Sequence, residues 1–156
     1  MTFEFIWVDS DPSQLDQVRT LFRTYAEELG VDLCFQGFEE ELATLPGKYA
    51  APAGGLLLAL CEGNAVGCAA FRPFEGSICE LKRFFVLPEY RRHGLASELL
   101  SRILAKAADS GYNRAHLDTL RRLEAANSFY HRNGFEEIES YYGNPIPDVV
   151  YFSRNI

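Results

Sequence analysis

Apolar residues in the first third of the chain follow one strand-like pattern and two helix-like patterns. Residues 3–8, "FEFIWV", alternate and carry bulky side chains, which predicts a β-strand. From residue 12 to residue 29, apolar side chains recur at helical spacing, after a capping aspartate and before a glycine. A shorter helix is expected at about residues 38–45, closed by Pro46-Gly47. This part of the chain therefore indicates the order β-α-α.

The middle third predicts three consecutive strands and a long helix. Residues 56–61 and 66–71 are apolar runs separated by "EGN", which is typical of a hairpin. Residues 77–87 form the next strand, which Pro88 stops. Apolar positions within residues 95–107 then repeat at helical spacing.

The last third predicts a strand at 114–120, a helix at 123–132, and strands at 135–140 and 149–154. The full order is therefore β-α-α-β-β-β-α-β-α-β-β, and its strand-helix-strand unit requires parallel strands joined by a right-handed crossover. We expect one α/β (α+β) domain over residues 1–156. Its sheet should be mixed and mostly antiparallel, with about seven strands, a central parallel unit, and four helices divided between the two faces.

Charge and composition narrow the class of protein. The net charge of −7 argues against nucleic-acid binding, which needs a basic face. The longest apolar run, residues 54–61, is too short to span a membrane, and the first residues lack a secretory pattern, so we expect a cytoplasmic protein. The four cysteines and three histidines lack the spacing of metal ligands, which predicts reduced thiols and no metal.

The segment "RRHGLASELL", residues 91–100, predicts an anion site at the start of the long helix. The first turn of a helix has free amides and a partial positive charge, and Gly94 lets an anion approach them closely. Ala96 is small, and Arg91 and Arg92 add positive charge at the entrance. The segment matches neither GxxxxGK[ST] nor GxGxxG, so a pyrophosphate cradle of another kind is one reading and a charged helix cap is the other.

Two longer stretches resemble the GNAT superfamily of N-acetyltransferases. "FFVLPEYRRHGLASELL" is similar to its strand ending in V-x-P, followed by [RQ]-x-x-G-x-[GA] and a helix, and "AANSFYHRNGF" is similar to its A-x-x-x-Y-x-x-x-G-F element. The matching residues are Val86, Pro88, Arg91, Gly94, Ala96, Ala126, Tyr130, Gly134 and Phe135. "CELKRFFV", "LDTL" and "YYGNP" further resemble a poorly characterised branch of the family, which implies no particular acceptor.

The resemblance implies acetyl-CoA as co-substrate and no metal. The pyrophosphate would lie on the loop and the pantetheine arm along the preceding strand. The residues implied for these contacts are Phe84, Phe85, Val86, Arg91, Arg92, His93, Gly94, Leu95, Ala96, Ser97 and Tyr130. An asparagine that commonly bonds the pantetheine is replaced by Leu123, and Asn127 is the nearby polar candidate.

The resemblance also implies roles in catalysis. Tyr130 would protonate the departing thiolate, or else it is a core tyrosine. The Phe84 amide would stabilise the oxyanion, because its strand is expected to splay from its neighbour there. Glu80 would act as general base, directly or through water, or else pair with Lys82 or Arg83. If this strand alternates, Glu80, Lys82 and Phe84 share one face.

Further polar and aromatic residues are candidates for binding the acceptor. Asp118 and Thr119 end a strand that should open towards the cleft, where Asp118 would anchor a cation or cap the next turn. The residues expected to form the walls are Tyr25, Phe35, Tyr49, Tyr141, Tyr142 and Asn144, although aromatic residues of this kind also fill cores.

The function that these residues favour is an acetyl-CoA-dependent N-acetyltransferase. It would move an acetyl group to a primary amine, on a small molecule or a peptide, by direct attack in a ternary complex. The alternative is a CoA-binding sensor or interaction protein without turnover. We expect no nucleic-acid or membrane partner, and a monomer or homodimer.

Overall fold

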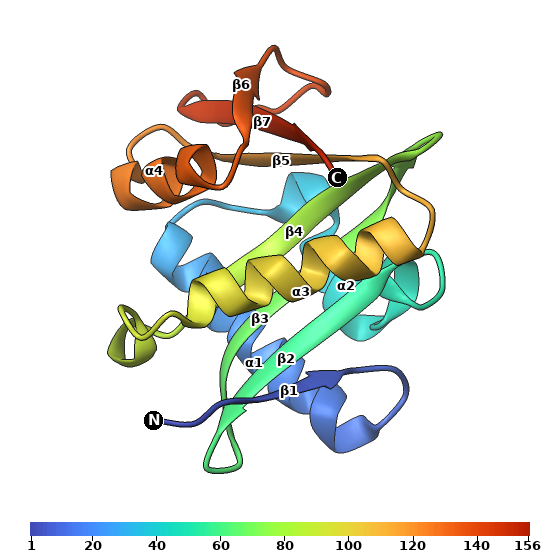
Figure 1. Ribbon diagram of the computed structural model, residues 1–156, viewed down its shortest axis with the longest axis vertical. Coiled ribbons are helices and arrows are strands. Elements are labelled where there is room, and N and C mark those ends of the chain that lie inside the picture. Colours follow the sequence, from blue (N-terminus) through green and yellow to red (C-terminus); the bar gives the residue numbers. More distant parts are fainter.

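The computed structural model describes residues 1–156, apart from the side chain of Phe35. It contains a seven-stranded sheet in the order β1-β2-β3-β4-β5-β7-β6 (Figure 1). The strands are β1 (Glu4–Trp7), β2 (Gly55–Cys61), β3 (Asn64–Glu75), β4 (Ile78–Val86), β5 (Arg114–Leu120), β6 (Glu136–Ile138) and β7 (Val149–Asn155). Strands β4 and β5 run parallel, and the other neighbouring pairs run antiparallel. The predicted mixed sheet is confirmed.

Four α-helices connect these strands, as predicted. They are α1 (Pro12–Leu29), α2 (Phe38–Ala43), α3 (Leu95–Asp109) and α4 (Glu124–Arg132). The sequence did not predict three one-turn 3₁₀ helices at Cys34–Gln36, Gly47–Tyr49 and Pro88–Tyr90. Such turns are too short to leave a periodic pattern. Within the described residues, no helix is both long enough and apolar enough to cross a bilayer.

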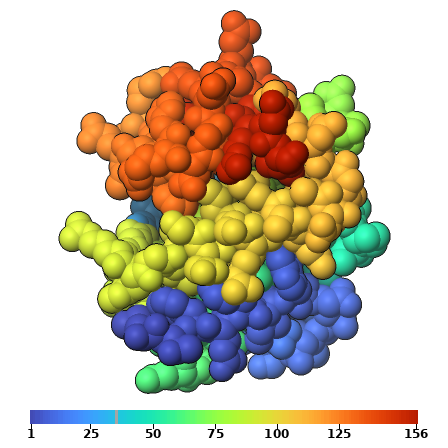
Figure 2. Space-filling view, viewed as in Figure 1, coloured from blue at the N-terminus to red at the C-terminus, as the bar shows by residue number. Residues whose placement is uncertain are grey.

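The helices bury two separate cores against the two faces of the sheet. Helix α3 packs Leu99 and Ile103 on one face, and α1 packs Val18 and Phe22 on the other. Successive side chains of a strand point to opposite faces of the sheet, so the strands contribute residues to both cores. Full burial of a large apolar side chain contributes about 1.5–3 kcal/mol to stability. Figure 1 shows α3 crossing the sheet in front and α1 behind it, and Figure 2 shows α3 on the surface between the N-terminal and C-terminal segments.

Strand β4 carries an irregularity that shapes the site. Cys68 of β3 pairs with Phe85, but Ala70 pairs with Lys82, so β4 has one residue more than β3 across this interval. Arg83 lies at this bulge with a φ of +59°, in the left-handed region of backbone conformation that residues other than glycine rarely adopt. Phe84 consequently joins the core on the α3 face. The prediction that Phe84 shares a face with Glu80 and Lys82 is therefore wrong, because the bulge interrupts the alternation.

Candidate active site

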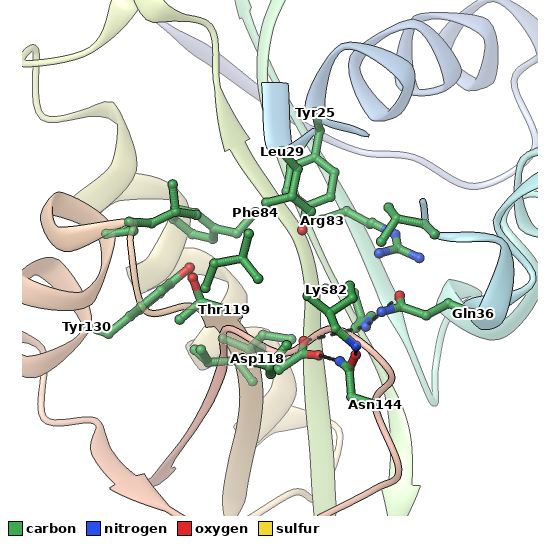
Figure 3. Close-up of a pocket in the computed structure, with 18 residues that line it drawn as sticks. Tyr25, Leu29, Gln36, Lys82, Arg83, Phe84, Asp118, Thr119, Tyr130 and Asn144 are labelled. Atoms are coloured by element: carbon green, nitrogen blue, oxygen red, sulfur yellow. Dashed lines mark hydrogen bonds and ion pairs between the residues drawn. The ribbon is translucent and has the colours of Figure 1, made fainter. Parts of the chain in front are cut away.

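A cleft of about 100 Å³ opens where β4 separates from β5 (Figure 3). The parallel ladder between these strands ends at the pair Glu80–His116. Beyond that pair, residues 81–84 and 117–120 line opposite sides of the opening. Helices α1 and α4 and the segment before β7 complete the walls. The splaying of the strands expected at Phe84 is thus confirmed, and it leaves one backbone edge of β4 without a β5 partner.

The loop before α3 has the form of an anion site. Gly94 caps the helix at φ +79°, and no side chain caps the first turn. A Cβ placed on Gly94 would meet no described atom within 4 Å, so the space beside this backbone is open. Arg92 and His93 are exposed on the same loop. The free first-turn amides suit a phosphate group.

Arg91 holds this loop in place. Its Nε donates to the Val86 carbonyl at 2.9 Å, and its Nη2 donates to both carboxylate oxygens of Glu28 at 2.8 and 2.9 Å. The side chain therefore joins the end of β4 to α1. These contacts make Arg91 a support for the loop, in addition to the positive charge expected from the sequence.

Arg83 secures the bulge from the other face of the sheet. Its guanidinium donates to both oxygens of Glu41 on α2, at 2.9 and 3.0 Å, and lies 5.2 Å from the centre of the Phe38 ring. Paired in this bidentate way, a buried arginine fixes its own backbone firmly. The ion pair with Glu41 therefore stabilises the point where β4 leaves β5.

Tyr130 lies between the cleft and the core. It lines the opening from α4 with a relative exposure of 8%, and its ring packs against Phe84, Phe135 and Phe152. Burial raises the pKa of Tyr130 above its usual value. The hydroxyl therefore stays protonated at neutral pH, as a proton donor must be.

Glu80 is engaged in an ion pair and does not line the cleft. Its Oε1 accepts from Arg72 at 3.0 Å, and its Oε2 accepts from the Tyr141 hydroxyl at 2.6 Å. The prediction that Lys82 or Arg83 would be the alternative partner of Glu80 is wrong. Lys82 pairs instead with Asp118 of β5, and Arg83 pairs with Glu41 of α2.

Asp118 is the centre of a polar cluster on the β5 side of the cleft. Oδ2 accepts from the Tyr142 hydroxyl and from Asn144 Nδ2, and Oδ1 lies 3.7 Å from the Lys82 ammonium nitrogen. Lys82 donates in turn to Gln36 Oε1 at 3.0 Å (Figure 3). No local pattern in the sequence marks Lys82 or Gln36 as functional, because their partners lie on distant elements. Burial lowers the pKa of Lys82.

The remaining candidates divide between the cleft and other places. Tyr25 and Thr119 line the cleft. Tyr49 lies instead under a second hollow beside α2, so its expected position in the acceptor wall is corrected. Asn127 donates to the carbonyls of Leu120 and Arg121, outside the cleft lining. The side chain of Phe35 lies outside the described part of the chain.

Comparisons with known proteins agree with this geometry. The chain matches the model of the acetyltransferase (GNAT) family over residues 15–135. An uncharacterized N-acetyltransferase of Schizosaccharomyces pombe is 43% identical over 142 residues, covering 90% of this chain and 87% of the relative. Another from Dictyostelium discoideum is 28% identical over 202 residues, covering 90% of this chain and 94% of that protein. The chain therefore belongs to the GNAT acetyltransferase family and is an acyltransferase.

Solved structures support the fold. An acetyltransferase from Streptococcus agalactiae has a TM-score of 0.83 at 23% identity, covering 99% of this chain and 98% of that one. The PaiA N-acetyltransferase of Thermoplasma acidophilum, solved in complex with coenzyme A, has a TM-score of 0.77 at 16% identity, with both chains covered in full.

Proposed function

We propose that the protein transfers an acetyl group from acetyl-CoA to a primary amine, by direct attack in a ternary complex. The observation that carries this proposal is the opening between β4 and β5, together with the N-terminus of α3 that follows β4, where no side chain caps the first turn. An extended arm can pair with the free edge of β4 while its phosphates meet the α3 amides. The structural relative from Thermoplasma acidophilum was solved with coenzyme A.

The residues present fit this co-substrate. The amides of residues 92–97 would hold the pyrophosphate, with open space over Gly94. The backbone of Phe84, Phe85 and Val86 would pair with the pantetheine arm. Asn127 is already bonded to two carbonyls, so its Oδ1, which is buried without a partner in the described structure, is the atom left for a contact.

Two groups at the opening would serve the chemistry. Acetyl-CoA supplies a thioester carbonyl and a thiolate leaving group. The Phe84 amide would donate to the oxygen on which negative charge develops, and Tyr130 would deliver a proton to the sulfur. Both lie at the cleft, on β4 and α4. For Glu80 we expect the structural role, because Arg72 and Tyr141 bond its oxygens and the residue does not line the cleft. The alternative role, a general base, would need water to carry the proton to it.

The proposal also keeps the wider expectations from the sequence. Residues 1–156 would form one catalytic domain that works in the cytoplasm, as a monomer or homodimer, on a small-molecule or peptide amine. The alternative, a CoA-binding sensor or interaction protein, would bind the cofactor without turnover.

Initial-rate kinetics test the proposal. We expect thiol release from acetyl-CoA that depends on added amine, with double-reciprocal lines that intersect, as direct attack in a ternary complex requires. Tight CoA binding without thiol release for any amine would favour the sensor. Parallel lines would indicate an acetylated enzyme and would contradict direct attack.

A further inference from the structure

Lys82 is a buried cation with unused hydrogen-bonding capacity, and it faces the acceptor side of the cleft. Its side chain is 3% exposed and lines the opening. An ammonium group carries three N–H donors. Among the described residues, Gln36 accepts one of them at 3.0 Å, whereas the Asp118 oxygen at 3.7 Å is beyond hydrogen-bond distance. A buried charge that is incompletely bonded is costly, so this site is suited to an anionic ligand.

Asp118 offers the opposite charge beside Lys82. Its Oδ2 already accepts from Tyr142 and from Asn144, and the bond from Asn144 is drawn in Figure 3. Its Oδ1, which lies 3.7 Å from the Lys82 ammonium nitrogen, accepts no hydrogen bond from the described residues. The two side chains therefore place one cation and one anion side by side in the cleft, which suits a ligand that carries both charges.

We infer, on the basis of the proposed function, that the acceptor carries a carboxylate close to its primary amine and belongs to the amino acids. Lys82 and Phe84 line the same cleft from β4, one on each side of the bulge at Arg83. A carboxylate bound at Lys82 would leave the neighbouring amine in this cleft, which the Phe84 amide is proposed to serve. Tyr25, Leu29 and Ile146 form the apolar part of the wall, where the acceptor side chain would lie.

The test compares matched acceptors that differ in the carboxylate. Leucine, serine and lysine would each be measured beside the methyl ester and the decarboxylated amine: 3-methylbutylamine, ethanolamine and cadaverine. Thiol release should show kcat/KM at least about tenfold higher for an amino acid than for its two counterparts, since one charge-assisted hydrogen bond is worth about 10- to 100-fold. The ester has the less basic amine, so amine reactivity alone would favour the ester instead.

Variants assign the preference to a residue. Lys82→Met should remove it, lowering the ratio of kcat/KM for the amino acid to kcat/KM for the decarboxylated amine by about 10- to 100-fold. Lys106→Met, whose lysine lies over the Trp7 ring, should retain the preference. Lys82→Gln serves if the methionine variant does not fold.

Each outcome decides between separate claims. Wild-type enzyme that uses the ester and the amine as well as the amino acid would overturn the acceptor assignment but leave the acetyltransferase function intact. A folded Lys82 variant with unchanged preference would overturn the role of Lys82. Absence of thiol release with every acceptor would instead overturn the proposed function, on which the inference depends.

Discussion

The two sides of the cleft are built from different parts of the chain. The proposed cofactor side consists of backbone: the amides at the start of α3, capped by Gly94, and the free edge of β4. The proposed acceptor side consists of side chains from separate elements, joined by the pairs Arg83–Glu41 and Lys82–Asp118. A group common to all reactions can be held by backbone geometry, whereas an acceptor must be distinguished by side chains. Substitutions on the two sides should therefore change different measured quantities, CoA affinity on one side and acetyl transfer on the other.

The largest effect is expected at Tyr130, where the two sides meet. Tyr130→Phe keeps the ring packing and removes the proposed acid, so single-turnover acetyl transfer should fall by about 10²–10⁴-fold. Affinity for CoA should change by no more than about 0.5–1.5 kcal/mol. Because burial raises the pKa of Tyr130, the wild-type rate should not fall with rising pH around neutrality through loss of this proton.

Tyr112→Phe is the matched control for Tyr130→Phe. Its hydroxyl bonds the Ala53 carbonyl at 2.7 Å, away from the cleft, so its loss should leave the transfer rate unchanged. A Tyr130→Phe rate within about threefold of wild type would be a much smaller change than acid catalysis produces. It would show that Tyr130 is a core residue and not the proton donor.

The next effect concerns the cofactor side alone. Gly94→Val places a side chain in the open space over the α3 amides, and affinity for CoA measured by calorimetry should fall at least about tenfold as phosphate hydrogen bonds are lost. Gly63→Val is a close control, because Gly63 has the same φ of +79° and equally open surroundings in the β2–β3 turn. Equal CoA affinity for the two variants would move the phosphate site elsewhere.

The bulge at Arg83 links the two sides, and a smaller effect tests it. In a Glu41→Ala background, Arg83→Gly and Arg83→Ala differ by one methyl group. Alanine at φ +59° is strained by roughly 1–2 kcal/mol, and glycine is not. Chemical denaturation should show the glycine variant to be more stable by about 1 kcal/mol, and its transfer rate should be several-fold higher. Indistinguishable stability and rate would show that this conformation does not hold the opening.

The smallest effect on rate is expected at Glu80, outside the cleft lining. Glu80→Gln breaks the ion pair with Arg72, so the free energy of unfolding should fall by about 1–3 kcal/mol. The rate of the folded enzyme should stay within about threefold between pH 6 and pH 9, since general acid–base groups contribute about 10²-fold or more. A loss that grows towards low pH, where the acceptor ammonium most needs a base, would restore the catalytic role of Glu80.

The same contrast explains what could be predicted from the sequence. The strands, the helices and the cradle at Gly94 depend on local periodicity and on a contiguous motif, and they could be read from neighbouring residues. The bulge could not, because its extra residue becomes visible only when β4 is aligned with β3. Nor could the long-range contacts: the ion pair of Arg83 with Glu41 joins residues 42 apart, and the hydrogen bond from Lys82 to Gln36 joins residues 46 apart. The partners of Glu80, Arg72 and Tyr141, could not be predicted for the same reason, and Lys82 was overlooked.

A crystal structure of the complex with coenzyme A tests the central claim most directly. The account predicts the pyrophosphate on the amides of residues 92–97, the pantetheine arm along the free edge of β4, and the sulfur within hydrogen-bond reach of the Tyr130 hydroxyl. Coenzyme A bound away from the opening between β4 and β5, for example in the hollow beside α2 at Tyr49, would contradict it.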